Sequence, residues 1–168
     1  RLRPGARLVE FDDEDCLRLL RLFNEPAGLA FLETLGVTEG EAASLSLLGI
    51  SSICNLLAAI KVAKYWELTE RDVVFTIFTD SVDLYRSRLT EQTAAHGVFT
   101  TQDAATAYVG SLERQQTDHL KELTHADRRA IHHLKYFTWV EQQGRSYDEL
   151  LAQWDPEYWQ EIWAEVGE

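Results

Sequence analysis

Two short groups of residues in the first half of the chain carry side chains that could bind a ligand. One is the turn GISS from Gly49 to Ser52, and the other is the polar triplet Thr79–Ser81, which begins with the last residue of the run VVFTIFT. Hydroxyls at the start of a helix lie beside free backbone N–H groups, and together with the helix dipole these can bind an anion. Ser81 could donate a hydrogen bond to a nitrogen of a heterocycle. The structural alternatives are that Ser51 or Ser52 is an ordinary helix N-cap and that Ser81 caps the next helix.

The elements predicted around these two groups form a helix that leads into a strand. The pattern after the serines predicts a helix that ends near Leu68. Residues 73–79 are uncharged and rich in β-branched and aromatic side chains, which is typical of a strand buried on both faces. A further helix is predicted from Val82 to about Ala95, and this order of elements indicates a parallel sheet. Because ligands bind at the carboxyl ends of strands in open α/β sheets, we expect Asp80 and Ser81 to lie at a ligand site.

The segments on either side of this region are predicted to be mostly helical. Residues 7–11 alternate in polarity and predict a strand, and Asp12 and Asp13 could cap the helix that follows. That helix places apolar residues on one face at helical spacing, namely Cys16, Leu19, Leu20 and Phe23. A short helix over 27–35 is expected to end at Gly36 in a left-handed C-cap, and residues 38–48 read as a linker. After residue 97 no strand is expected, only helices over 101–116, 124–133, 147–153 and 156–166.

The order of these motifs resembles the C-terminal part of fold-type II pyridoxal-phosphate enzymes, and within them the cysteine synthase and cystathionine β-synthase branch. Members carry a Gly-Ile-Ser-Ser or Gly-Pro-Ser-Ser turn before the helix, then a strand ending in Pro-Asp-Ser or Pro-Ser-Ser. The stretches RLLRLFNEPAG and KYFTWVEQQGRSYDELLAQWDPEYW also look like bacterial relatives of this branch, so the resemblance covers most of the chain. It implies an α/β fold, part of a three-layer parallel sheet of the tryptophan synthase β type, for residues 1–97. A helical extension over 98–168 would follow.

The resemblance also implies roles for four residues at a pyridoxal 5'-phosphate site. Ser81 matches the serine that hydrogen-bonds the pyridine nitrogen, and a neutral hydroxyl there leaves that nitrogen unprotonated. The cofactor is then suited to β-elimination or β-replacement on an amino-acid substrate, which implies a lyase or transferase. Gly49 matches a glycine whose backbone passes close to cofactor and substrate, where a side chain would intrude. Ser51 and Ser52 match the turn serines.

The chain also departs from the family pattern. Ile53 stands where cysteine synthases usually have a second glycine, and Thr79 replaces the usual proline. The family's Schiff-base lysine and Gly-rich phosphate loop have no match here. Lys61 and Lys64 are predicted to lie on the polar, solvent-facing side of their helix, so no catalytic residue is assigned.

We therefore expect this chain to be inactive alone and to need the remainder of the enzyme, an N-terminal part, or self-association. The absence of any methionine favours a fragment or subunit of a larger protein. Two alternatives stay open. The chain could be a non-catalytic remnant or partner subunit that acts as an interaction module, or an unrelated α/β ligand-binding domain.

Composition and charge limit the remaining classes of function. The chain has 16 Lys and Arg against 28 Asp and Glu, a net charge of −12, which argues against a nucleic-acid partner because phosphate binding needs clustered cations. No apolar run is long enough to span a membrane, so we expect a soluble, cytoplasmic protein. Cys16 and Cys54 are expected to be reduced, buried small hydrophobes. Three histidines (His125, His132 and His133) form no HExxH motif, so no metal site is predicted.

Overall fold

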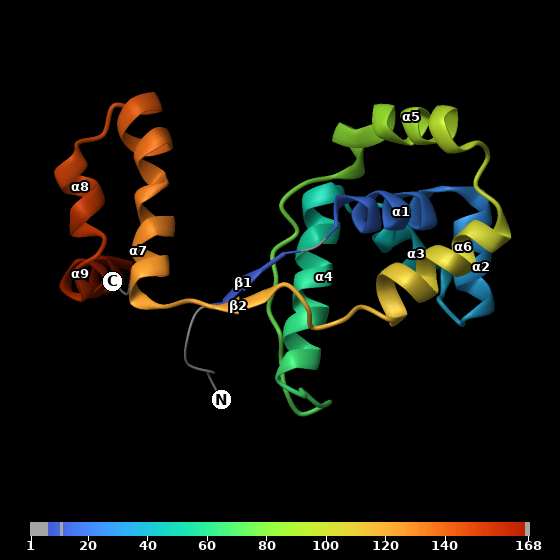
Figure 1. Cartoon of the computed structure of the whole chain (residues 1–168), viewed down its shortest axis with the longest axis horizontal. Coiled ribbons are helices and arrows are strands. Elements are labelled where there is room, and N and C mark those ends of the chain that lie inside the picture. Colours follow the sequence, from blue (N-terminus) through green and yellow to red (C-terminus); the bar gives the residue numbers. More distant parts are fainter. Residues whose placement is uncertain (1–6, 11, 167–168) are drawn as a thin grey trace. The chain divides into compact units, whose positions relative to one another are not determined.

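The structure is a computed structural model, and it describes residues 7–10 and 12–166. The chain divides into two compact units, one made mainly of Leu8–Lys121 and the other mainly of Glu122–Glu168. Figure 1 shows the helices and strands with their labels. No described helix is both long and apolar enough to cross a membrane.

The core of the first unit is built on α1 (Asp13–Asn24), which is the helix predicted there. Asp12 is its N-cap and accepts a hydrogen bond from the backbone N–H of Glu14 at 2.9 Å. The four residues predicted to share one face are all buried: Cys16, Leu19, Leu20 and Phe23. Helical spacing thus identified the buried face of α1 correctly, because a side chain recurs on the same side every three to four residues.

Two shorter helices follow α1. Helix α2 (Pro26–Thr34) begins with proline, whose missing N–H costs nothing in a first turn. The left-handed residue predicted after it is confirmed, since Gly36 has φ = 89°. Residues 38–48, predicted to be a linker, contain α3 (Glu39–Leu45), which begins with a capping box between Thr38 and Glu41. The Ser/Thr-x-x-Glu signal for this helix was present in the sequence.

Helix α4 (Ile50–Tyr65) is the long helix predicted after the GISS turn, and it ends three residues before the expected Leu68. The segment after it runs back along α4 in extended conformation (Figure 1). It then continues into the 3₁₀ turn η1 (Val82–Tyr85) and α5 (Arg86–His96). The helix expected from Val82 to about Ala95 is therefore present as two pieces.

The α/β fold with a three-layer parallel sheet is wrong for the described residues. Residues 73–79 form no strand, and Phe75 is 94% exposed. The two strands that the structure describes, β1 (Arg7–Val9) and β2 (Leu120–Glu122), pair in a small antiparallel sheet, and the described chain is mostly helical. An apolar strand becomes buried only when it pairs with neighbouring strands and other elements cover both faces of the sheet. Here the nearest partner of residues 73–79 is the side of α4, where the Asn55 amide donates to the Ile77 carbonyl at 2.7 Å.

The C-terminal helical segments of the first unit pack against its N-terminal helices. Helix α6 (Thr101–Ala107) begins where the sequence predicts a helix, has Thr100 as its N-cap and continues into the π-helical turn η2 (Tyr108–Glu113). Both contact α1, and α6 also contacts α2. Ala104 and Ala107 are buried in this contact, since small side chains let the helices approach closely. Strand β2 was not predicted from the sequence, because three residues give too short a pattern to recognise.

The second unit consists of helical segments and contains most of the tryptophans. They are α7 (His125–His133), the π-helical turn η3 (Tyr136–Gln142), α8 (Tyr147–Ala152) and α9 (Pro156–Val166). Capping boxes at Thr124 and Ser146 start α7 and α8, so the helices predicted here are confirmed. Leu150 is fully buried against this helical group. The division between the two compact units lies at residues 121 and 122, whereas the domain boundary at residues 97 and 98 rests on the family resemblance and stays a prediction.

Candidate functional site

The GISS turn and the polar triplet meet at the N-terminus of α4. Both oxygens of the Asp80 carboxylate accept backbone hydrogen bonds, Oδ2 from Ser51 at 3.0 Å and Oδ1 from Ser52 at 2.8 Å. The Ser52 hydroxyl lies 2.7 Å from Oδ1 and 2.8 Å from the Asp80 carbonyl oxygen. Neither serine is the N-cap, which is Gly49. The free N–H groups that could have bound a ligand anion therefore bind a carboxylate of the same chain.

These contacts keep Asp80 ionised. Burial by itself raises its pKa, but hydrogen bonds from Tyr85, Ser52 and the backbone N–H groups of Ser51 and Ser52 outweigh that effect and lower the pKa to about 2. The same contact with Asp80 raises the pKa of Tyr85, because the phenol stabilises the carboxylate only while it keeps its proton. Asp80 therefore acts as a fixed negative charge at the positive end of the α4 dipole.

A side chain at Gly49 would collide with neighbouring atoms, as the sequence suggested. In the structure these atoms belong to Asp80 and Tyr85. A Cβ atom at this position would lie 2.7 Å from the Asp80 carboxylate and 2.9 Å from the Tyr85 ring. Glycine thus allows Asp80 and Tyr85 to pack over the start of α4. A close approach to a bound cofactor stays a prediction.

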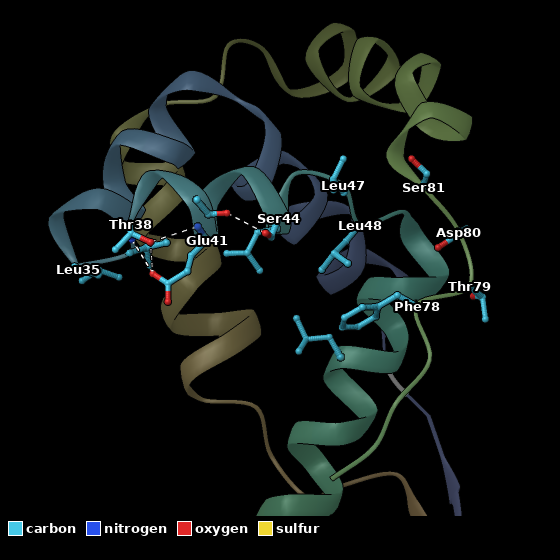
Figure 2. A pocket seen from close by; sticks show the side chains of 15 residues that line it. Leu35, Thr38, Glu41, Ser44, Leu47, Leu48, Phe78, Thr79, Asp80 and Ser81 are labelled. Atoms are coloured by element: carbon cyan, nitrogen blue, oxygen red, sulfur yellow. Dashed lines mark hydrogen bonds between the residues drawn. The ribbon is translucent and has the colours of Figure 1, made fainter. Parts of the chain in front are cut away.

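An open cavity of about 1290 Å³ lies beside this cluster (Figure 2). Its walls come from α3, from the turn before α4 and from residues 78–81. The apolar side chains that line it are Leu35, Val37, Leu45, Leu47, Leu48, Leu56 and Phe78. Its polar side chains are Thr38, Glu41, Ser44, Thr79, Asp80 and Ser81. Among the described residues that line it there is no lysine, arginine or histidine, so the cavity favours a ligand with an apolar body and hydrogen-bonding edges.

Ser81 is half-buried and lines this cavity. Its hydroxyl caps η1 by accepting a hydrogen bond from the Asp83 backbone N–H at 3.3 Å. The O–H group has a long contact of 3.5 Å to the Asp83 carboxylate, so it retains capacity to donate to a ligand. The backbone around it is fixed, because the Val82 N–H donates to the Leu47 carbonyl at 3.1 Å and Gly49 donates to the Asp80 carbonyl at 3.2 Å.

The lining of the cavity suits the pyridine ring of pyridoxal 5'-phosphate but not its phosphate group. The Ser81 hydroxyl and the leucine walls suit a pyridine ring and its nitrogen. The phosphate finds no cation in the lining, and the N–H groups of Ser51 and Ser52 already bind Asp80. The described residues that line the cavity therefore supply neither the contacts that a phosphate would need nor a lysine that could hold the cofactor.

The side chain of Lys61 is buried, whereas the sequence predicted that it would face solvent. It is 2% exposed, so the prediction of a solvent-facing side chain is wrong, whereas Lys64 is exposed. Lys61 Nζ donates to the Glu10 carbonyl at 2.9 Å, to the Asp118 carbonyl at 3.1 Å and to the Asp118 carboxylate at 3.0 Å. These three hydrogen bonds hold the residue after β1 and a residue just before β2 against α4, which is a structural role.

The sequence contained a signal for the burial of Lys61. This residue follows Ile53 and Leu57 at intervals of four, and all three are buried on one face of α4. In the second unit, His132 Nε2 lies 2.9 Å from the Leu150 carbonyl oxygen, and the His125 and His132 rings contact Trp154. Within residues 7–10 and 12–166 no group of three or more His, Cys, Asp or Glu is arranged to hold a metal ion.

The chain was compared with known proteins at three levels. No protein-family model matches it, and neither a curated protein nor a solved structure matches it.

Proposed function

We propose that this chain is the C-terminal portion of a cysteine-synthase-like, pyridoxal-phosphate-dependent lyase or transferase that acts on amino acids. The observation that carries the proposal is Ser81, a residue that lines the large cavity beside Asp80 and whose hydroxyl makes only a long contact to the Asp83 carboxylate. The motif series GISS, apolar run and Thr79–Ser81 supports it through the family resemblance. Ser81 would donate its hydrogen bond to the pyridine nitrogen.

The residues of this chain would bind and orient the ring. When bound, the cofactor supplies the electron sink for β-elimination or β-replacement. The leucine walls would exclude water from one face, and the contact of Asp80 with α4 would hold Ser81 in place. The lysine and the phosphate loop would come from an N-terminal part, because the described lining residues contain no cation.

A second candidate function is that of a non-catalytic partner subunit. Large apolar side chains are exposed along residues 73–78, most of all Val73, Phe75 and Ile77. Contiguous apolar surface of this kind marks interaction sites in monomeric proteins. An interaction module would use this segment to bind the rest of the enzyme without contributing to chemistry.

Mixing experiments separate the two functions. We expect the chain, combined with a candidate N-terminal portion that carries the lysine and the Gly-rich loop, to give a complex that binds pyridoxal 5'-phosphate with visible absorbance. Loss of the Ser81 hydrogen bond in Ser81→Ala should weaken cofactor binding about 2-fold to 10-fold and shift the absorbance maximum. Cofactor titration followed by absorbance measures both effects.

The matched control is Ser44→Ala, which removes another hydroxyl from the same cavity. The Ser44 hydroxyl donates to the Gly40 carbonyl of its own helix at 2.9 Å, so its removal should leave cofactor affinity unchanged. Equal affinity of Ser81→Ala and the unsubstituted chain would remove Ser81 from the site. A stable complex without any cofactor absorbance would favour the interaction module.

A further inference from the structure

Two cysteines that are far apart in sequence face each other between α1 and α4. The Sγ atoms of Cys16 and Cys54 lie 3.2 Å apart, and both are free thiols. Cys16 is fully buried in the core, whereas Cys54 is partly exposed. Helices α1 and α4 pack directly on each other here. A disulfide needs an S–S distance of about 2.05 Å, so the two sulfurs need only a small approach to bond.

The two thiols differ in acidity. The hydrogen bond between them raises the pKa of Cys16, and burial and the carboxylates of Asp13 and Asp15 raise it further. The same contact lowers the pKa of Cys54, because a thiolate at Cys54 can accept a hydrogen bond from the Cys16 S–H group. Cys54 thus becomes the first thiolate, and its partial exposure gives an oxidant access to it.

The geometry points to Cys16 and Cys54 as a reversible disulfide site that links α1 to α4, with a low-molecular-weight disulfide as the oxidant. The Cys54 thiolate attacks one sulfur of that disulfide, and a mixed disulfide forms while one small thiolate leaves. Cys16 then loses its proton and attacks the Cys54 sulfur, which releases the second small thiolate. The protein loses two protons and two electrons, and the S–S bond of the oxidant is reduced to two thiols that take up both.

The disulfide would form close to the N-terminus of α4, where Ser51 and Ser52 bind Asp80. Cys54 lies two residues after Ser52, whose hydroxyl and N–H bind Asp80. The disulfide would close a loop spanning positions 16 to 54 and so restrict the unfolded chain. This inference does not depend on the proposed cofactor role.

The test treats the full chain with oxidised glutathione and follows free thiols, intact mass and mobility on non-reducing gels. We expect both thiols to be lost, the mass to fall by two hydrogens, and the chain to stay monomeric without a glutathione adduct. The midpoint of thermal unfolding should rise by about 10 °C and return after reduction. Unreactive thiols, a stable adduct on the unsubstituted chain, or disulfide-linked dimers would overturn the inference.

Two variants test the order of the steps. In Cys16→Ala the resolving thiol is missing, so a glutathione adduct should accumulate on Cys54. In Cys54→Ala the buried Cys16 should remain largely unmodified in the folded state. Cys16→Val, which keeps more of the core volume, repeats the first test if Cys16→Ala unfolds. Equal adduct formation on Cys16 in Cys54→Ala would contradict Cys54 as the attacking thiol.

Discussion

Gly28→Ala is expected to lower the free energy of unfolding of the first unit by about 2–3 kcal/mol. The Cβ atom added to this buried residue of α2 would overlap with the backbone carbonyl oxygen of Leu22 in α1. A backbone atom cannot rotate away as the end of a side chain can, so the two helices would have to separate. The gain of about 1 kcal/mol from replacing glycine by alanine in a helix offsets only part of this cost.

Urea unfolding followed by far-UV circular dichroism measures the effect. Gly40→Ala in α3 is the matched control, because a Cβ atom there has no neighbour within 4 Å. It should leave stability unchanged or raise it slightly. If Gly28→Ala is as stable as Gly40→Ala, the close approach of α1 and α2 at this position is wrong.

The second large effect is expected for Asp80→Asn, which removes the negative charge at the start of α4. The amide can accept fewer of the hydrogen bonds that Ser51 and Ser52 donate, and it loses the favourable interaction with the helix dipole. Because the site is partly exposed, we expect a loss of about 1–2 kcal/mol at neutral pH. Thermal and urea unfolding at pH 7 measure it.

The loss should depend on pH in a defined direction. The pKa of Asp80 falls from 3.8 in an unperturbed carboxyl to about 2 in the folded chain. The folded state thus binds this proton less readily than the unfolded state. The stabilisation is fully present above pH 3.8 and disappears as the pH falls through about 2. The stability difference between the unsubstituted chain and Asp80→Asn should therefore shrink over this interval.

Asp83→Asn provides the control for charge alone. Asp83 pairs with Arg86 at 2.6 Å, but both side chains are well exposed, so the substitution should change stability by less than about 0.5 kcal/mol. A difference between unsubstituted chain and Asp80→Asn that stays constant down to pH 2 would contradict the role of the Asp80 charge.

Local signals predicted most helices of this chain. Asp12, a cap candidate in the sequence, is the N-cap of α1, and Thr100, Thr124 and Ser146 are the caps of helices whose starts the sequence predicted. The information for a helix end is contained in a few consecutive residues, because the side chain bonds to N–H groups two or three positions away. Residues 39–45 carry the same kind of signal, so the predicted linker over 38–48 is wrong where α3 forms.

The structure brings Gly49, Ser51 and Ser52 together with Asp80 at the start of α4. The sequence predicted Gly49, Ser51, Ser52 and Ser81 as cofactor-binding residues, and that role stays a prediction. It did not indicate that Asp80 itself would occupy the anion position. That contact joins residues 28 positions apart, and no local pattern encodes it.

By itself the sequence determined most of the helices and the apolar face of α1, since these depend on neighbours within one or two turns, although the N-cap of α4 is Gly49 and not one of the predicted serines. Only the tertiary structure decided that residues 73–79 stay exposed and form no strand, because a strand needs partners that can be distant in the chain. It also decided the burial of Lys61, whose charge is accommodated by Glu10 and Asp118 from far along the chain. The GISS turn and the Thr79–Ser81 triplet became one site for the same reason: long-range hydrogen bonds, not local propensity, join them.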